Sequence, residues 1–136
     1  MTQCLITLEK LSEEKDMGNV SIDNGVLVID GKRIKSKYDV THYVVIGEVV
    51  VVRLKCEGRK DDINNVYGVK DGKIAWRVQD MLEYNPDYAP FMPNPYTYIK
   101  VYEKDPGVVL AGTFQGFTFL INPNNGRIIG TESWEK

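Results

Sequence analysis

The chain has 136 residues, the usual size of one domain, so we expect a single domain spanning 1–136. Hydrophobic residues make up 43% and charged residues 26%, which excludes a disordered tail, a collagen-like fibre and a membrane-spanning protein. Lys and Arg total 17 and Asp and Glu total 19, giving a net charge of −2, so the chain lacks the basic excess of a nucleic-acid binder.

The N-terminal residues fit two patterns. Leu5, Leu8 and Leu11 have helical spacing, whereas Cys4, Ile6 and Leu8 alternate as they would in a strand. We expect a strand over 3–8 followed by a polar loop through Asp16, and the helix stays as the alternative.

The rest of the chain has the composition of an antiparallel β protein. Runs rich in Val, Ile, Tyr, Phe and Thr alternate with Gly, Asn and Asp. The run over 48–55 is apolar on both faces, so we expect it at the centre of a sheet. Helical turns, one or two at most, fit only over 77–83 apart from the N-terminus. The predicted strands cover residues 26–29, 43–46, 48–55, 66–69, 74–78, 98–102, 108–111, 117–121 and 127–129.

The turns support this interpretation. Four Asx-Gly pairs separate apolar runs, and such pairs are favoured where both central residues of a hairpin need positive φ. These pairs are Asn24-Gly25, Asp30-Gly31, Asp71-Gly72 and Asn125-Gly126. A further hairpin turn is expected over 112–116. The sequence therefore predicts a mainly β fold, a single antiparallel domain arranged as a sandwich, a half-barrel or a propeller-blade-like sheet.

One segment, 83–98, differs from the rest. It holds four of the six prolines and four of the eight tyrosines. Prolines at this density oppose a helix and a central strand, so we expect a long, conformationally restricted loop. Loops of this length in a compact domain are commonly functional.

The hairpins resemble one another. Val69–Trp76 and Ile121–Gly130 each combine an apolar strand, an Asx-Gly turn, a basic residue and a second apolar strand, and Ile29–Ile34 is a shorter version. The sequence Gly72–Trp76 resembles the outer hairpin of β-propeller blades of the pyrroloquinoline-quinone-dehydrogenase type. At most three blades fit in this length. The resemblance implies a partial propeller closed by oligomerisation or a blade-like sheet curled into a sandwich or half-barrel, and we expect the second. No cofactor follows from it, because the ligand residues of that family are not found.

Candidate chemistry is sparse. His42 is the single histidine, three residues after Asp39, and this pair could form a base dyad only if a turn intervenes. Cys56, beside Lys55, is a candidate reactive thiol. With one histidine and two distant cysteines, neither a zinc site nor a disulfide scaffold is expected, and no phosphate-binding glycine loop is present. We expect no metal and no cofactor.

The aromatic residues are the best functional candidates. Tyrosine offers large contact area at low entropic cost, which suits an interaction surface, and proline would keep the loop ordered. The alternative is that the rings cover an open edge or end of the sheet. The candidate binding residues are Tyr84, Tyr88, Phe91, Tyr96, Tyr98 and Trp134.

These residues lead to three hypotheses. The first is a non-catalytic protein that binds another protein, or a second copy of itself, through the aromatic loop and a sheet face. The second is a β domain that binds a small ligand with the same rings. The third is an enzyme that uses His42 with Asp39. Residues 1–11 lack a secretory pattern and the longest apolar run is Val49–Val52, so we expect a cytoplasmic protein without nucleic-acid or membrane partners.

Overall fold

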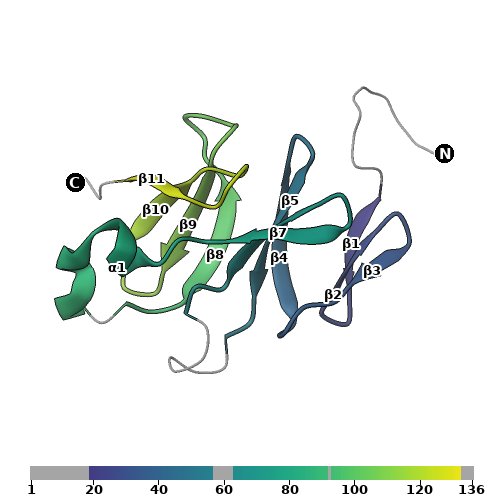
Figure 1. The fold of residues 1–136 in the computed structure, drawn as a ribbon, viewed down its shortest axis with the longest axis horizontal. Helices are drawn as coiled ribbons and strands as arrows, with labels where there is room; N and C mark the ends of the chain where they lie inside the picture. Colours follow the sequence, from purple (N-terminus) through teal and green to yellow (C-terminus); the bar gives the residue numbers. More distant parts are fainter. Residues whose placement is uncertain (1–18, 57–62, 92, 133–136) are drawn as a thin grey trace.

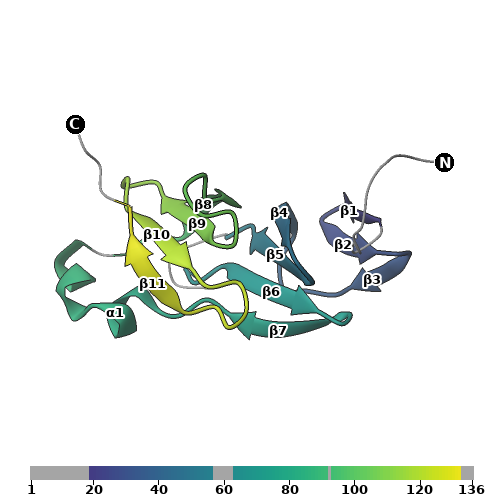
Figure 2. The same ribbon diagram turned by 90° about the horizontal axis from the view of Figure 1, so that it is seen from above.

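The computed structural model describes residues 19–56, 63–91 and 93–132. Within these ranges the chain forms three small antiparallel sheets with two short helical segments, which confirms the predicted mainly β fold class. The sheets follow one another along the chain, and the second lies between the first and the third (Figures 1 and 2). The strand predicted over 3–8 lies outside the described residues. No helix of the described part is long and apolar enough to cross a membrane.

The first sheet is a three-stranded meander. Its hairpin turns, Asn24-Gly25 and Asp30-Gly31, have positive φ at both residues, between 50° and 83°, as the Asx-Gly pairs predict. Its first strand was not predicted, although its four residues alternate apolar and polar side chains as in a half-buried strand. The strands are β1 (Val20–Asp23), β2 (Val26–Ile29) and β3 (Lys32–Ile34), in that order.

The second sheet is the centre of the molecule. Its strand β5 is paired on both sides and buried on both faces, as its apolar sequence predicts. Val49 and Val51 face the third sheet, whereas Val50 and Val52 face the first sheet. The strands, in spatial order, are β4 (Val40–Ile46), β5 (Val49–Leu54), β6 (Val66–Lys70) and β7 (Lys73–Arg77).

The third sheet carries the C-terminal strands and positions the candidate site. It is a four-stranded antiparallel meander like the second. Phe119 and Ile121 are fully buried against the second sheet. The strands, in chain order, are β8 (Tyr96–Val101), β9 (Val109–Thr113), β10 (Thr118–Ile121) and β11 (Ile128–Thr131).

Trp76 joins the second sheet to the third. Its indole Nε1–H donates a hydrogen bond of 2.7 Å to the carbonyl oxygen of Pro123, in the turn between β10 and β11. The ring also lies over Gly68 and Gly126, where an added Cβ would come within 2.2 and 2.5 Å of the indole. Glycine is needed at both positions because the ring packs directly on the backbone. Trp76 therefore fixes the two sheets relative to each other.

The fourth Asx-Gly pair forms a different turn. Gly126 has a φ of 78°, but Asn125 is not among the residues with positive φ in the described chain. Instead, the Gly126 N–H donates to the carbonyl oxygen of Asn122, four residues earlier. Pro123 lengthens this loop beyond a two-residue hairpin, so the type of turn predicted for Asn125-Gly126 is wrong.

The expectation of one long loop over 83–98 is also corrected. The segment begins in α1 (Met81–Tyr84), continues through the 3-10 helix η1 (Pro86–Phe91) and ends in β8, which starts at Tyr96. The side chain of Asp80 caps α1 by accepting from the Leu82 N–H at 2.9 Å. Pro86 occupies the first position of η1, where proline is favoured, and Pro90 lies inside this six-residue segment.

Candidate functional site

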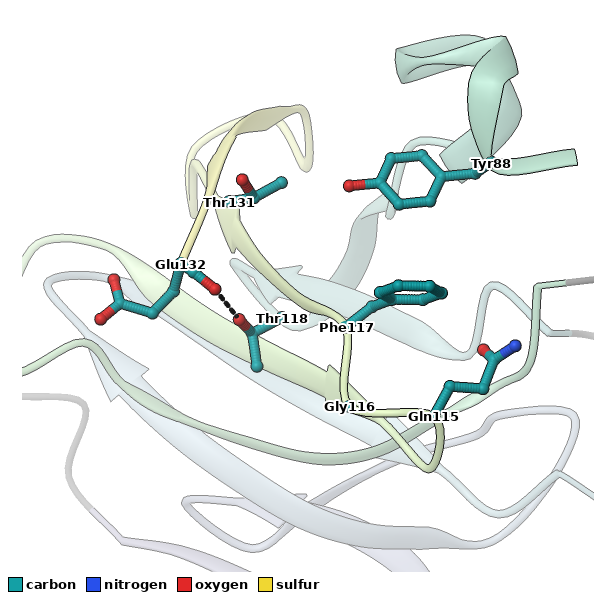
Figure 3. A pocket seen from close by; sticks show the side chains of 7 residues that line it. All are labelled: Tyr88, Gln115, Gly116, Phe117, Thr118, Thr131 and Glu132. Carbon is teal, nitrogen blue, oxygen red and sulfur yellow. Dashed lines mark hydrogen bonds between the residues drawn. The ribbon is translucent and has the colours of Figure 1, made fainter. Parts of the chain in front are cut away.

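An open cavity of about 510 Å³ lies at the end of the third sheet. Three elements border it: η1, the turn between β9 and β10, and the end of β11 (Figure 3). Its lining combines two aromatic rings with hydroxyl, amide and backbone groups. The lining residues are Tyr88, Gln115, Gly116, Phe117, Thr118, Thr131 and Glu132.

Aromatic rings form one wall of the cavity. Tyr88 projects from η1 and packs edge-on against Phe117 and Phe119, with ring centroids 5.3 Å away in both cases. Phe91, at the end of η1, packs against Phe117 with a centroid distance of 5.4 Å. Edge-to-face pairs of this kind add to the stability gained from buried area. The cluster anchors η1 to the sheet and leaves one side of Tyr88 and Phe117 facing the cavity.

Polar groups surround these rings. The Tyr88 hydroxyl points across the cavity toward Thr131 (Figure 3), and burial, followed by the neighbouring Tyr84, raises the pKa of Tyr88 above its ordinary value. Because its pKa is raised, the Tyr88 side chain is a neutral hydrogen-bonding group at physiological pH. The Thr118 hydroxyl also lines the cavity, and it donates a hydrogen bond of 2.7 Å to the Glu132 carbonyl oxygen.

The carboxylate of Glu132 points away from the cavity (Figure 3). It accepts a hydrogen bond of 2.6 Å from the Tyr102 hydroxyl and lies 3.5 Å from the Lys104 ammonium. The Tyr102 hydrogen bond is the main cause of the lowered pKa of Glu132, with Lys104 contributing in the same direction. Glu132 thus lines the cavity with its backbone and secures the end of β11 with its side chain.

Two exposed phenylalanines lie on the elements that border the cavity. Phe114, in the turn between β9 and β10, has 86% of its surface exposed, and Phe91 has 54% exposed. The side-chain amide of Gln115 donates to the Phe91 carbonyl oxygen, which holds the turn beside η1. The turn that carries the exposed Phe114 is therefore joined through Gln115 to the end of η1, which carries the exposed Phe91.

The predicted binding residues do not all lie in the same place. Tyr88 lines the cavity, and Phe91 packs against the rings of Tyr88 and Phe117. Tyr84 packs against the core and contacts Phe119 edge-on, and Tyr96 is fully buried beside the same ring. These two positions agree with the alternative interpretation, in which the rings cover the sheet.

Tyr98 lies elsewhere on the third sheet. A register shift separates it from Tyr96, and its ring packs over Gly112. Trp134 lies outside the described residues. The sequence interpretation did not include Phe114 and Phe117 among the binding residues. For Phe114 a signal was present, because it lies between Gly112 and Gly116 in a predicted turn, where a large aromatic side chain tends to be exposed.

The proposed His42–Asp39 pair is not arranged as a dyad. His42 is exposed on β4, and its Nδ1 shares a hydrogen bond of 3.0 Å with the Thr41 hydroxyl. The carboxyl group of Asp39 instead lies against Gly25 in the first hairpin turn. Cys56 is half-buried. Within the described ranges no three His, Cys, Asp or Glu side chains are grouped to hold a metal ion.

Comparison with known proteins adds a family. One family model matches residues 17–133, and its description is Domain of unknown function (DUF7957). The chain belongs to this family. The match includes all three sheets and both walls of the cavity. No curated protein matches the chain.

Proposed function

We propose that the protein is a non-catalytic interaction protein that binds another protein at its aromatic surface, defined as the cavity together with Phe91 and Phe114. The main support is the exposure of two aromatic rings on elements joined by the Gln115 hydrogen bond: Phe114 is 86% exposed and Phe91 is 54% exposed. Burying a phenylalanine side chain is worth roughly 1.5–3 kcal/mol relative to leaving it in water. A protein partner that buries both exposed rings would therefore gain this free energy on binding.

The chemistry around these rings fits a protein partner. Interface centres are enriched in aromatic residues and depleted in charge, with polar groups at the rim. Phe91, Phe114 and Phe117 supply the apolar part, and Gln115 and Thr131 supply neutral polar groups. We propose that this interaction takes place in the cytoplasm.

A small ligand is the second candidate, and the cavity favours it. Its volume of about 510 Å³ falls in the range of ~300–1,000 Å³ typical of small-molecule sites. The Tyr88 hydroxyl and the Thr131 side chain face each other across it (Figure 3). Such a ligand would stack on Phe117 and hydrogen-bond at its edges, but it would leave Phe114 exposed.

Site-specific photocrosslinking tests the proposal. A photoreactive phenylalanine analogue replaces Phe114 in the protein expressed in its own cells, and a second variant carries the analogue at the exposed Lys70, in the second sheet, as the control. The proposal predicts a discrete crosslinked protein at position 114 that is absent at position 70. No crosslink at 114, or the same crosslinks at both positions, would refute it.

A further inference from the structure

A second cavity, of about 330 Å³, lies at the junction of the second and third sheets, where the turn between β10 and β11 reaches β7 (Figure 2). It shares no lining residue with the cavity beside η1. Its volume is at the lower end of the ~300–1,000 Å³ typical of small-molecule sites, so it suits a small ligand. Its polar and charged lining includes Asn64, Arg77, Gln79, Asp80, Glu83 and Arg127.

Gln79 fixes the walls of this cavity relative to each other. Its backbone N–H donates to the Gly126 carbonyl oxygen at 2.9 Å, and its side-chain oxygen accepts from the Ile128 N–H at 2.9 Å. The Asn125 side chain holds the same turn by accepting from the Arg127 N–H at 3.0 Å. Because these bonds tie the turn to the segment after β7, a ligand would not have to order the walls on binding.

Charged side chains of both signs line the cavity. Arg77 ends β7, and Arg127 precedes β11. Asp80 caps α1, and Glu83 lies within it. In the part of the chain that the structure describes, neither carboxylate forms an ion pair with Arg127. All four side chains are exposed, so a ligand can reach opposite charges that are not paired with each other across the cavity.

The Asn64 side chain adds an acceptor that lacks a donor. Its Oδ1 is buried, and no described residue donates to it. The backbone carbonyl oxygen of the same residue already accepts from the Arg77 Nε at 3.1 Å. A buried acceptor without a donor is costly and indicates a water, an ion or a ligand group that donates to it. An ammonium group, which has three N–H donors and no acceptor, would satisfy it.

We propose that this cavity binds a small zwitterion, an α-amino acid in its free form. Guanidinium groups bind carboxylates through paired hydrogen bonds, so Arg127 together with Arg77 would hold the α-carboxylate. Asp80, Glu83 and the Asn64 Oδ1 would hold the α-ammonium. A ligand with a single charge would satisfy one set of groups and leave the other without a partner. The zwitterion is therefore the ligand class that this lining fits best.

NMR titration of the isotope-labelled full chain with each of the common L-amino acids tests the proposal. At least one amino acid is expected to shift the backbone amide signals of Asn64, Gln79 and Arg127 until they saturate. Its N-acetyl derivative lacks the ammonium, and its amide derivative lacks the carboxylate. Each derivative should bind at least tenfold more weakly than the parent amino acid, because one set of charged groups loses its partner.

Variants locate the binding site. Glu83→Gln and Arg127→Gln each remove one charge from the cavity and should weaken binding about tenfold, because a charge-assisted hydrogen bond is lost. Asp87→Asn and Lys70→Gln are the matched controls and should leave the affinity unchanged, because these exposed side chains lie outside the cavity. Far-UV circular dichroism verifies that all four variants are folded.

The proposal is overturned if no amino acid shifts these amides, if either singly charged derivative binds as tightly as the parent, or if the cavity variants bind like the controls. These measurements do not involve Phe91 or Phe114. Failure of this proposal is therefore distinguishable from failure of the proposed function.

Discussion

Asn65 is expected to stabilise the junction between the second and third sheets, because its side chain bonds to a strand of each. It is buried, and its side chain makes three hydrogen bonds: Nδ2 donates to the carbonyl oxygens of Leu54 at 2.8 Å and Tyr96 at 3.0 Å, and Oδ1 accepts from the Tyr96 N–H at 2.9 Å. At about 1 kcal/mol for each bond, Asn65→Ala should reduce the free energy of unfolding by about 3 kcal/mol. A domain is stable by only ~5–15 kcal/mol, so this loss is large.

Asn65→Asp gives a sharper test of the same contacts. The carboxylate keeps the acceptor for the Tyr96 N–H but faces two carbonyl oxygens without a donor. Burial would raise the pKa of this carboxyl above its unfolded value of about 3.9. Its folded form then binds a proton before the unfolded form does, so the stability deficit should shrink as the pH falls from neutral toward that value.

Urea unfolding followed by far-UV circular dichroism measures both effects, with the unmodified chain measured at each pH. Asn124→Ala, at an exposed turn position, is the control and should change the free energy of unfolding by less than ~0.5 kcal/mol. The reasoning is refuted if Asn65→Ala behaves like this control, or if the deficit of Asn65→Asp is independent of pH.

Further predictions concern the sheet junction and the site. Trp76→Ala should lower the free energy of unfolding by about 3 kcal/mol in urea titrations, because the ring joins two sheets. Gly68→Ala should also destabilise, since its methyl would lie 2.2 Å from the indole, and it should cost less in the Trp76→Ala background; additive effects would contradict this contact. Tyr102→Phe should raise the pKa of Glu132 in an NMR titration, because it removes the main cause of the lowering; an unchanged pKa would contradict this assignment. Phe114→Ala should leave the free energy of unfolding within ~0.5 kcal/mol of wild type, and a larger loss would mean that the ring is structural.

The local patterns predicted most of the strands but not the way the sheets combine. Alternation and apolar runs identified β5 as central, and three of the four Asx-Gly pairs form the expected turns. These features depend on neighbouring residues only. The contacts of Asn65 with Tyr96 and of Trp76 with Pro123 join residues 31 and 47 positions apart, so no local pattern could reveal them.

Local sequence patterns indicated only some residues of the candidate site, because the others are brought there by contacts between distant segments. The tyrosine and proline content of 83–98 directed attention to Tyr88, which lines the cavity, and to Phe91, which packs against the Tyr88 ring. Composition could not distinguish these rings from Tyr96, because its burial depends on contact with Phe119 in another strand. Phe114 was missed because the turn over 112–116 was interpreted only as a connection between strands.

The proposed function requires that a protein partner bind at Phe91 and Phe114. Native mass spectrometry of the chain, purified gently from its own cells, tests it most directly, with the Phe91→Ala/Phe114→Ala double variant measured in parallel. We predict that the 15.5 kDa chain carries the added mass of a second, different protein, and that the double variant loses it. A bare monomer, an increment of a small molecule alone, or an added protein that the double variant retains would contradict the account.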